Sequence, residues 1–221
     1  GDDWQSIEAF AGSDIKIMTR DFEKIFGFRK TLTLDKTFRF NQALCDITNE
    51  FILRNKYQLR KKVKSNIQKN NQRIVEFHDL KIDELSLDFK NNENKEIFEK
   101  YYLFLFLNKI NKHLVGDTAI LTRYNYYKYI KVLTKPKIKS LLSKYKNIQW
   151  STVTGFKGKE SDNIIIDRLQ SGYFGFPAGI PEDPILFLVK NFDPNEMKDA
   201  EERRFFYVTL TRAKKKIFVI S

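Results

Sequence analysis

Short apolar runs recur along the second half of the sequence, and they limit the possible folds more than any other feature. Residues 118–122 (TAILT), 163–169 (NIIIDRL) and 216–220 (KIFVI) are rich in β-branched or aromatic side chains and too short for buried helices. Strands that are apolar on both faces are typical of parallel sheets, because helices cover both sides of such sheets. Stretches with helical spacing separate these runs, as crossover connections require. The pattern predicts an α/β fold with a mainly parallel sheet.

Local signals place the expected helices and strands. Asn41 can cap a helix over residues 42–54, in which apolar side chains recur at helical spacing. Three further helices are expected at 95–113, 137–145 and 200–213. The expected strands lie at 31–34, 118–122, 148–153, 163–169 and 216–220.

The composition of the 221 residues excludes several classes of protein. Hydrophobic residues make up 42% of the chain, which is enough for a core and excludes a disordered chain. One cysteine, Cys45, cannot form an internal disulfide, and with only two histidines it cannot build a structural zinc module. No apolar run reaches the roughly 18 residues of a membrane helix, and the start GDDW is unlike a signal peptide. We therefore expect a cytoplasmic protein without a membrane partner.

The net charge of +12, from 40 Lys+Arg and 28 Asp+Glu residues, indicates a polyanionic partner. Residues 54–73 hold many of the cations and no acid. This stretch is read either as a solvated basic segment after a helix or as a phosphate-binding segment. The charge alone does not choose between these two interpretations.

Four segments follow one another in a pattern shared with a family of motor proteins. They are residues 1–14 (GDDWQSIEAFAGSD), 34–41 (LDKTFRFN), 152–162 (TVTGFKGKESD) and 201–213 (EERRFFYVTLTRA). In order and spacing they resemble the third to sixth motifs of superfamily 1 helicases of the UvrD/Rep/PcrA type. The resemblance implies the second, C-terminal RecA-like domain of an ATP-dependent DNA helicase or translocase, in a family that moves 3′ to 5′ on single-stranded DNA.

The resemblance assigns five residues to ATP. Gln5 and Arg39 match residues that contact the γ-phosphate, and Phe38 matches the aromatic that stacks on adenine. Glu160 matches the carboxylate that binds the ribose hydroxyl. Arg212 matches the arginine finger, which stabilises charge on the transferred phosphoryl group. A fork-shaped, permanently charged guanidinium suits phosphate oxygens, although Arg39 taken alone would be a surface ion-pair partner.

The resemblance assigns five further residues to single-stranded DNA. Phe10 matches the aromatic platform for a base, a contact that tolerates any sequence. Thr152 and Thr154 match the DNA side of the fifth motif. Arg123 and Asn125 match positions near the DNA backbone, and a strand end with a capping asparagine explains them equally well.

Two elements of the family are missing from the sequence. Neither a GxxxxGK[ST] phosphate loop nor a DExxD-type metal-binding segment occurs, and residues 155–159 (GFKGK) lack the glycine and the hydroxyl residue of such a loop. The family carries both in its first RecA-like domain, so the Mg²⁺ ligands are expected there. We expect residues 1–221 to be the second domain alone, inactive as an ATPase in isolation. Only residues 126–151 stand where relatives carry a large inserted subdomain, and residues 170–184 look most like the helicase IV branch.

Other functions stay open at this stage. Glu8, Ala11 and Thr154 depart from the family pattern on the DNA side, which leaves room for a helicase-like subunit of a nuclease complex or for a non-motor nucleic-acid-binding module. The charge alone would also fit a basic RNA-associated domain. The retained Arg39 and Arg212 favour the motor.

Overall fold

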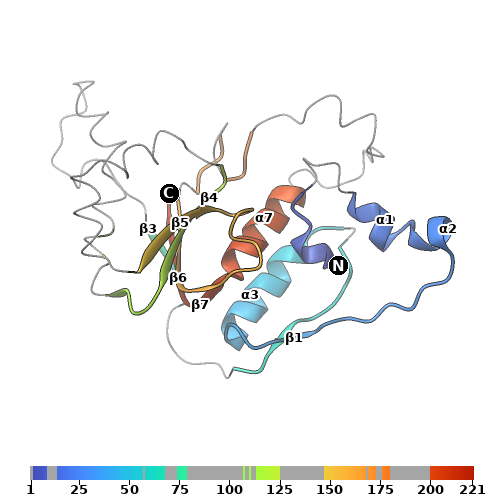
Figure 1. Cartoon of the computed structure of the whole chain (residues 1–221), viewed down its shortest axis with the longest axis horizontal. Coiled ribbons are helices and arrows are strands. Elements are labelled where there is room, and N and C mark those ends of the chain that lie inside the picture. The colour runs from blue at the N-terminus through green and yellow to red at the C-terminus, as the bar shows by residue number, and fades with distance from the viewer. Residues whose placement is uncertain are drawn as a thin grey trace.

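A computed structural model describes residues 2–8, 14–56, 58–67, 74–78, 107, 110, 113–124, 147–167, 169–172, 176–179 and 200–221. Its described part contains a parallel five-stranded sheet in the order β3-β7-β6-β4-β5 (Figure 1). The strands are β3 (Val75–His78), β4 (Thr118–Thr122), β5 (Ile148–Thr152), β6 (Ser161–Ile166) and β7 (Ala213–Ile220). The expected α/β fold with a mainly parallel sheet is confirmed.

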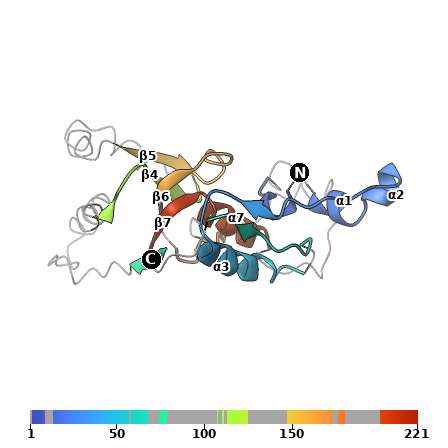
Figure 2. The same ribbon diagram turned by 90° about the horizontal axis from the view of Figure 1, so that it is seen from below.

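Two eleven-residue helices, α3 (Gln42–Ile52) and α7 (Ala200–Leu210), pack on the same face of this sheet (Figure 2). The side chain of Asn41 accepts a hydrogen bond from the backbone N–H of Leu44 at 3.2 Å, so the predicted N-cap is present. Both helices end earlier than expected. After α7 the chain turns directly into β7, which removes the last residues of the predicted helix 200–213.

The remaining elements are short. They are η1 (Asp3–Gln5), α1 (Ile15–Thr19), α2 (Phe22–Phe26), and a small parallel pair made by β1 (Lys36–Thr37) and β2 (Lys64–Ser65). The predicted strand at 31–34 is wrong, because this segment is exposed and pairs with no strand. Leu32 and Leu34 are 81% and 91% exposed. Strand β3 was missed because its sequence VEFH is polar at alternate positions, as an edge strand allows.

The core has two layers because successive strand residues point to opposite faces of the sheet. One layer faces α3 and α7, and the other faces Leu107 and Ile110, which are buried and helical. The rest of the predicted helix 95–113, apart from residue 113, and all of 137–145 lie outside the described residues. The first layer contains Ala119, Leu121, Ile164, Ile166, Ile217 and Val219, and the second contains Ile120, Ile165, Phe218 and Ile220.

Residues 2–8 form part of this domain. The Trp4 ring is fully buried and makes an edge contact with Tyr207 of α7, with ring centroids 5.5 Å apart. Its indole N–H donates to the carbonyl of Leu59 at 2.9 Å. Arg204 of α7 donates to the carbonyl of Ser6 at 2.8 Å. These contacts hold the segment that contains Gln5 against α7.

The connections place functional segments at two opposite edges of the sheet. In a parallel sheet all strands begin at one edge and end at the other. Residues that follow β4 and β5 therefore lie at the carboxyl edge, and residues that precede β6 and β7 lie at the amino edge. The connection 153–160 crosses from the carboxyl end of β5 to the amino end of β6, and Val153 and Phe156 anchor it in the core.

Gly116, just before β4, is required by its backbone and by its surroundings. Its φ is +91°, and a Cβ there would lie 1.8 Å from a carboxylate oxygen of Asp162, which forms an ion pair with Lys215. We expect Gly116→Ala to lower the free energy of unfolding by about 2 kcal/mol. Gly27→Ala is the matched control, because Gly27 has φ +87° with open space around it and reports backbone strain alone. Equal losses in urea titrations of both variants would contradict the proposed clash.

Candidate functional site

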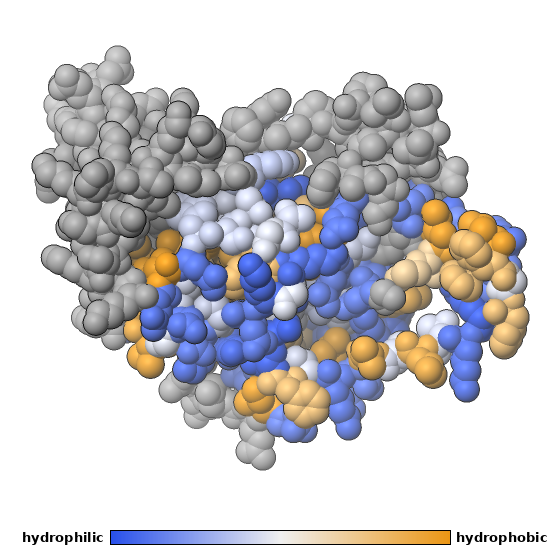
Figure 3. All heavy atoms as spheres, in the orientation of Figure 1, coloured by the Kyte–Doolittle hydropathy of each residue, from blue (hydrophilic) through white to orange (hydrophobic). Residues whose placement is uncertain are grey.

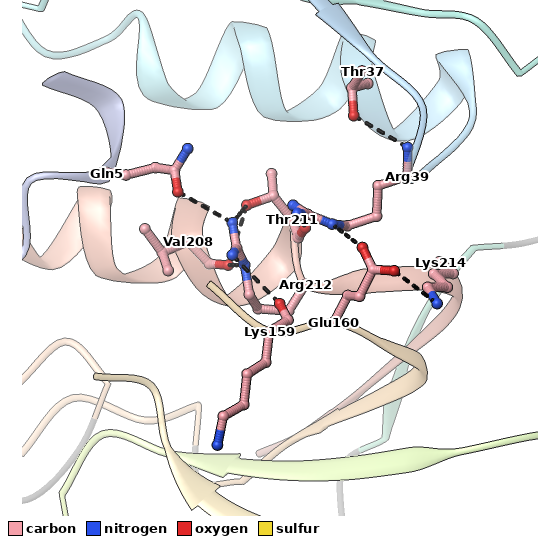
Figure 4. A network of polar contacts seen from close by, with 9 residues as sticks. All are labelled: Gln5, Thr37, Arg39, Lys159, Glu160, Val208, Thr211, Arg212 and Lys214. Atoms are coloured by element: carbon pink, nitrogen blue, oxygen red, sulfur yellow. Dashed lines mark hydrogen bonds and ion pairs between the residues drawn. The ribbon is translucent and has the colours of Figure 1, made fainter. Parts of the chain in front are cut away.

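A network of polar side chains joins four segments at the amino edge of β6 and β7 (Figure 4). Gln5 belongs to η1, and Arg39 lies in the bend after β1. Glu160 is the residue immediately before β6. Arg212 stands in the turn between α7 and β7. The fold thus brings together four of the residues predicted for the nucleotide site, although up to 207 positions separate them along the chain.

The guanidinium group of Arg212 is almost fully enclosed, with 2% of the residue exposed. Its Nε donates to the carbonyl of Val208 at 3.0 Å, and one terminal nitrogen donates to the carbonyl of Lys159 at 3.4 Å. The other terminal nitrogen donates to Gln5 Oε1 and to Thr211 Oγ1, both at 3.3 Å. Acceptors on three sides hold the planar group in one orientation. Of these acceptors, the side chain of Gln5 is the one that η1 provides.

Arg39 is held by Glu160 and by the backbone. Its Nε donates to Glu160 Oε2 at 2.8 Å, and Nη1 donates to the carbonyl of Thr211 at 3.1 Å. The second carboxylate oxygen of Glu160 forms an ion pair with Lys214 Nζ at 2.8 Å. Since Arg39 and Arg212 both contact residue Thr211, the two guanidinium groups lie close together.

The charges in this network favour an anion. Burial lowers the pKa of Arg212 to about 10, and the nearby charge of Arg39 acts in the same direction, so Arg212 stays protonated at neutral pH. Hydrogen bonds from Lys214 and Arg39 lower the pKa of Glu160, and its carboxylate raises the pKa of Lys214. Arg39 and Lys214 share the carboxylate of Glu160, and Arg212 is hydrogen-bonded to neutral groups, so the cluster keeps a positive charge that phosphate oxygens can neutralise.

Phe38 points away from the core beside this cluster. It is 71% exposed, whereas Phe40 is 4% exposed and belongs to the core. The backbone N–H of Arg39 donates to Thr37 Oγ1 at 3.3 Å, which fixes the bend between the two phenylalanines. An exposed aromatic face next to a cationic cluster suits a purine nucleotide.

The carboxyl edge holds part of the predicted DNA site. Thr152 is the last residue of β5, and its hydroxyl accepts the N–H of Gly155 at 3.1 Å. Thr154 is half-buried in the turn that follows. Phe10 and Asn125, which were also predicted to contact DNA, lie outside the described residues.

Arg123, at the end of β4, is engaged within the protein. Its Nη2 lies 2.6 Å from Glu202 Oε1, its Nε lies 2.9 Å from the same oxygen, and both side chains are 13% exposed. The guanidinium group also stacks over the Phe205 ring at 3.5 Å. Glu202 Oε2 accepts the backbone N–H of Ala178 at 3.0 Å. Arg123 therefore links the carboxyl edge of the sheet to the first turn of α7.

Two structural links join the edges. Helix α7 carries Glu202 near its start and leads into Arg212 after its end, across about 16 Å at 1.5 Å per residue. The connection 153–160 begins next to Thr152 and ends at Glu160. Both links are anchored in the core, through Phe205 and Val208 of α7 and through Val153 and Phe156 of the connection.

Sequence reasoning missed three interactions of these edges. Lys214 holds Glu160, Glu202 holds Arg123, and Glu8 forms a 2.9 Å ion pair with Lys157. The last pair explains one departure from the family pattern, because Glu8 ties the third-motif segment to the fifth-motif connection. All three partners are distant in sequence, so no local signal could have found them.

The described residues contain no group of three or more His, Cys, Asp or Glu side chains that could hold a metal ion. They also contain no helix long and apolar enough to span a membrane. The carboxylate at the cationic cluster, Glu160, is occupied by Arg39 and Lys214. The described part of the cluster therefore suits phosphate oxygens and does not suit a divalent cation.

Comparisons with known proteins agree with this arrangement. Residues 129–221 match the family described as the UvrD-like helicase C-terminal domain. Over 224 residues the chain is 31% identical to DNA helicase IV of Escherichia coli (strain K12), an alignment that covers 100% of this chain and 28% of the relative. The chain thus spans little more than a quarter of the curated relative that it matches. The family match over residues 129–221 and the similarity along the whole chain support a C-terminal fragment of a UvrD/Rep-type helicase with an α/β fold of the RecA-like type.

Proposed function

We propose that this chain is the second RecA-like motor domain of an ATP-dependent DNA helicase or translocase that moves 3′ to 5′ on single-stranded DNA. The observation that carries the proposal is that Arg39 and Arg212 lie close together at the amino edge, where both contact Thr211. The one carboxylate in this network, Glu160, pairs with Arg39 and with Lys214. Arg39 shares its one carboxylate with Lys214, and Arg212 is bonded to neutral acceptors only, so both guanidinium groups can take phosphate oxygens. The relative named DNA helicase IV agrees with this role.

Each residue of the cluster has a proposed role toward ATP. The Phe38 ring stacks on adenine, and Glu160 accepts a hydrogen bond from the ribose. Arg39 and Gln5 contact the γ-phosphate, and Arg212 stabilises the charge that develops during phosphoryl transfer. The residues fit an anionic nucleotide, whereas Mg²⁺, which neutralises phosphate charge in such sites, would be held by residues of the first RecA-like domain.

Binding of nucleotide would reorganise existing contacts. In the structure Arg39 is paired with Glu160, and Arg212 is bonded to Gln5. A γ-phosphate offers both arginines a stronger anionic partner than a shared carboxylate or a neutral amide. The change is proposed to pass along α7 and the connection 153–160 to the carboxyl edge. There Thr152 and Thr154 would contact single-stranded DNA, and Arg123 would support this edge through its pair with Glu202. The resemblance gives Phe10 and Asn125, which lie outside the described residues, roles on the same DNA strand.

An exposed apolar surface supports the proposal of a companion domain. The apolar side chains of α1, α2 and the following extended segment lie at the right-hand end of the molecule and along its lower edge (Figure 3). Its exposed members are Ile17, Met18, Ile25, Phe26, Phe28, Leu32 and Leu34. Patches of this kind mark interaction sites in proteins. We propose that the first RecA-like domain covers this surface, that residues 1–221 are the second domain without a large insertion, and that the protein is cytoplasmic.

The proposal is tested with the full-length protein and with the isolated chain of 221 residues. We expect ATP hydrolysis by the full-length protein to rise when single-stranded DNA is added, and we expect the isolated chain to hydrolyse no ATP. Duplexes with a 3′ tail should be unwound and duplexes with a 5′ tail should not. Binding of single-stranded DNA without DNA-stimulated hydrolysis would instead favour a non-motor binding module. Hydrolysis by the isolated chain would contradict a site shared between two domains.

A further inference from the structure

Four cations form an exposed surface outside both proposed sites, which we call the basic strip: Arg60, Lys62, Lys64 and Lys36. Arg60, Lys62 and Lys64 are exposed, whereas Lys61, Val63 and Ser65 between and after them are half-buried, so the three cations face the solvent together. The residues between them face inward, where Val63 packs against the core. The alternation makes a one-sided row of positive charge.

The fold holds this row in place. Asn49 of α3 bonds both backbone groups of Val63, donating to the carbonyl at 2.7 Å and accepting the N–H at 3.1 Å. Lys61 turns toward Asp2, with 2.6 Å between Nζ and Oδ1, and lies over the Trp4 ring at 4.8 Å. The hydroxyl of Ser65 donates to the carbonyl of Phe40. The exposed cations are therefore presented from a fixed backbone.

The strip concentrates charge at a cost to the fold. Lys36 and Lys64 are direct register partners in the β1–β2 pair, and both are exposed. Like charges directly opposite one another on paired strands are unfavourable. Among the described residues no ion pair or side-chain hydrogen bond involves any cation of the strip. Lys61, by contrast, is paired with two aspartates in the same segment.

The chemistry of the strip indicates its ligand. Single-stranded sites combine cations with aromatic platforms for bases, and the strip consists of cations alone. Duplex DNA presents phosphates on its outside at one charge per roughly 1.7 Å of axis. A rigid, exposed row of cations matches such a surface and carries no means of reading a base. We propose that the basic strip binds the phosphate backbone of duplex DNA, as a contact separate from the single-stranded DNA at the carboxyl edge.

The test uses the full-length protein without nucleotide and a blunt duplex of about two helical turns, which has no single-stranded tail. The variant replaces Arg60, Lys62 and Lys64 with glutamine. Each cation that neutralises a phosphate makes the decrease of log K with log salt concentration steeper by about 0.9. Loss of three cations should therefore make the decrease shallower by about 2.7. At 0.1 M salt the affinity for the duplex should fall on the order of 10²-fold. Affinity for single-stranded DNA should change less than about twofold, because the strip lacks stacking side chains.

A control variant removes the same amount of charge elsewhere. It replaces Arg54, Lys56 and Lys215, all exposed and outside the strip, with glutamine. We expect its duplex affinity and salt slope to match those of the unaltered protein. An equal loss in both variants would show that net charge alone attracts DNA and would overturn the proposal. A larger loss for single strands than for duplex, or no binding of duplex by the unaltered protein, would overturn it as well.

A second variant separates binding from folding. Lys64→Glu places a carboxylate directly opposite Lys36, so the like-charge pair becomes an attractive one. We expect its melting temperature to be unchanged or higher while its duplex affinity falls by at least tenfold. A fall in both would attribute the lost binding to damage of the β1–β2 pair and would contradict the strip as a binding surface. These readouts need no ATP, so they stand apart from the test of the proposed motor.

Discussion

Replacement of Arg212 by alanine is expected to lower the kcat of DNA-stimulated ATP hydrolysis in the full-length protein by about 10³-fold or more. An arginine that stabilises the transferred phosphoryl group contributes roughly 10³–10⁵ in rate. The structure holds this guanidinium group nearly immobile through Val208, Lys159 and Gln5, so little entropy is lost when it contacts phosphate. The loss should appear in kcat with little change in the apparent affinity for single-stranded DNA.

Because Arg212 is buried, its replacement could also weaken the fold, and a second variant distinguishes the two effects. Arg212→Lys keeps the positive charge but loses the fork that bonds several acceptors. We expect it to recover part of the stability and less than about a tenth of the kcat. Lys215→Ala, on the exposed side of the same strand, should leave kcat unchanged. Full activity in Arg212→Ala, at an unchanged melting temperature, would rule out the proposed arginine finger.

Replacement of Glu202 by alanine is expected to lower the free energy of unfolding by about 3 kcal/mol. The carboxylate neutralises Arg123 in a pair that is 13% exposed on both sides, and it also accepts the N–H of Ala178. Without it the arginine is left enclosed over the Phe205 ring without a counter-charge. Glu202 also lies in the first turn of α7, where the helix dipole favours an acid. Urea-induced unfolding followed by circular dichroism measures the loss.

The double variant Arg123→Met with Glu202→Leu tests the cause of this loss. Replacing both members of an enclosed ion pair with apolar side chains of similar size removes the stranded charge, so the double variant should be more stable than Glu202→Ala by about 1–2 kcal/mol. It should stay below the unaltered protein, because the N–H of Ala178 loses its acceptor. Glu50→Ala breaks the exposed pair with Arg54 and should cost less than about 0.5 kcal/mol. If the double variant is less stable than Glu202→Ala, the pair is not the source of the effect. Reduced DNA-stimulated hydrolysis in a stably folded double variant would support the link between the carboxyl edge and α7.

The sequence was sufficient to predict most of the central sheet. The runs at 118–122 and 163–169 are apolar on both faces, and such strands need helices on both sides wherever they occur in a chain. Strand β3 and the β1–β2 pair escaped prediction because they are short and largely polar. Their existence depends on partners that the fold supplies, since an isolated strand of two to four residues has no stability of its own.

For the candidate site, the sequence determined which residue types stand at which spacing, and only the tertiary structure decided which of them meet. Gln5, Arg39, Glu160 and Arg212 could be selected from local patterns, because each pattern is a continuous stretch of chain. The pairing of Glu160 with Lys214, of Arg123 with Glu202, and the outward row of the basic strip depend on strand register and on how α7 crosses the sheet. A charged side chain selects its partner by distance and by exclusion of water, and both are properties of the folded chain.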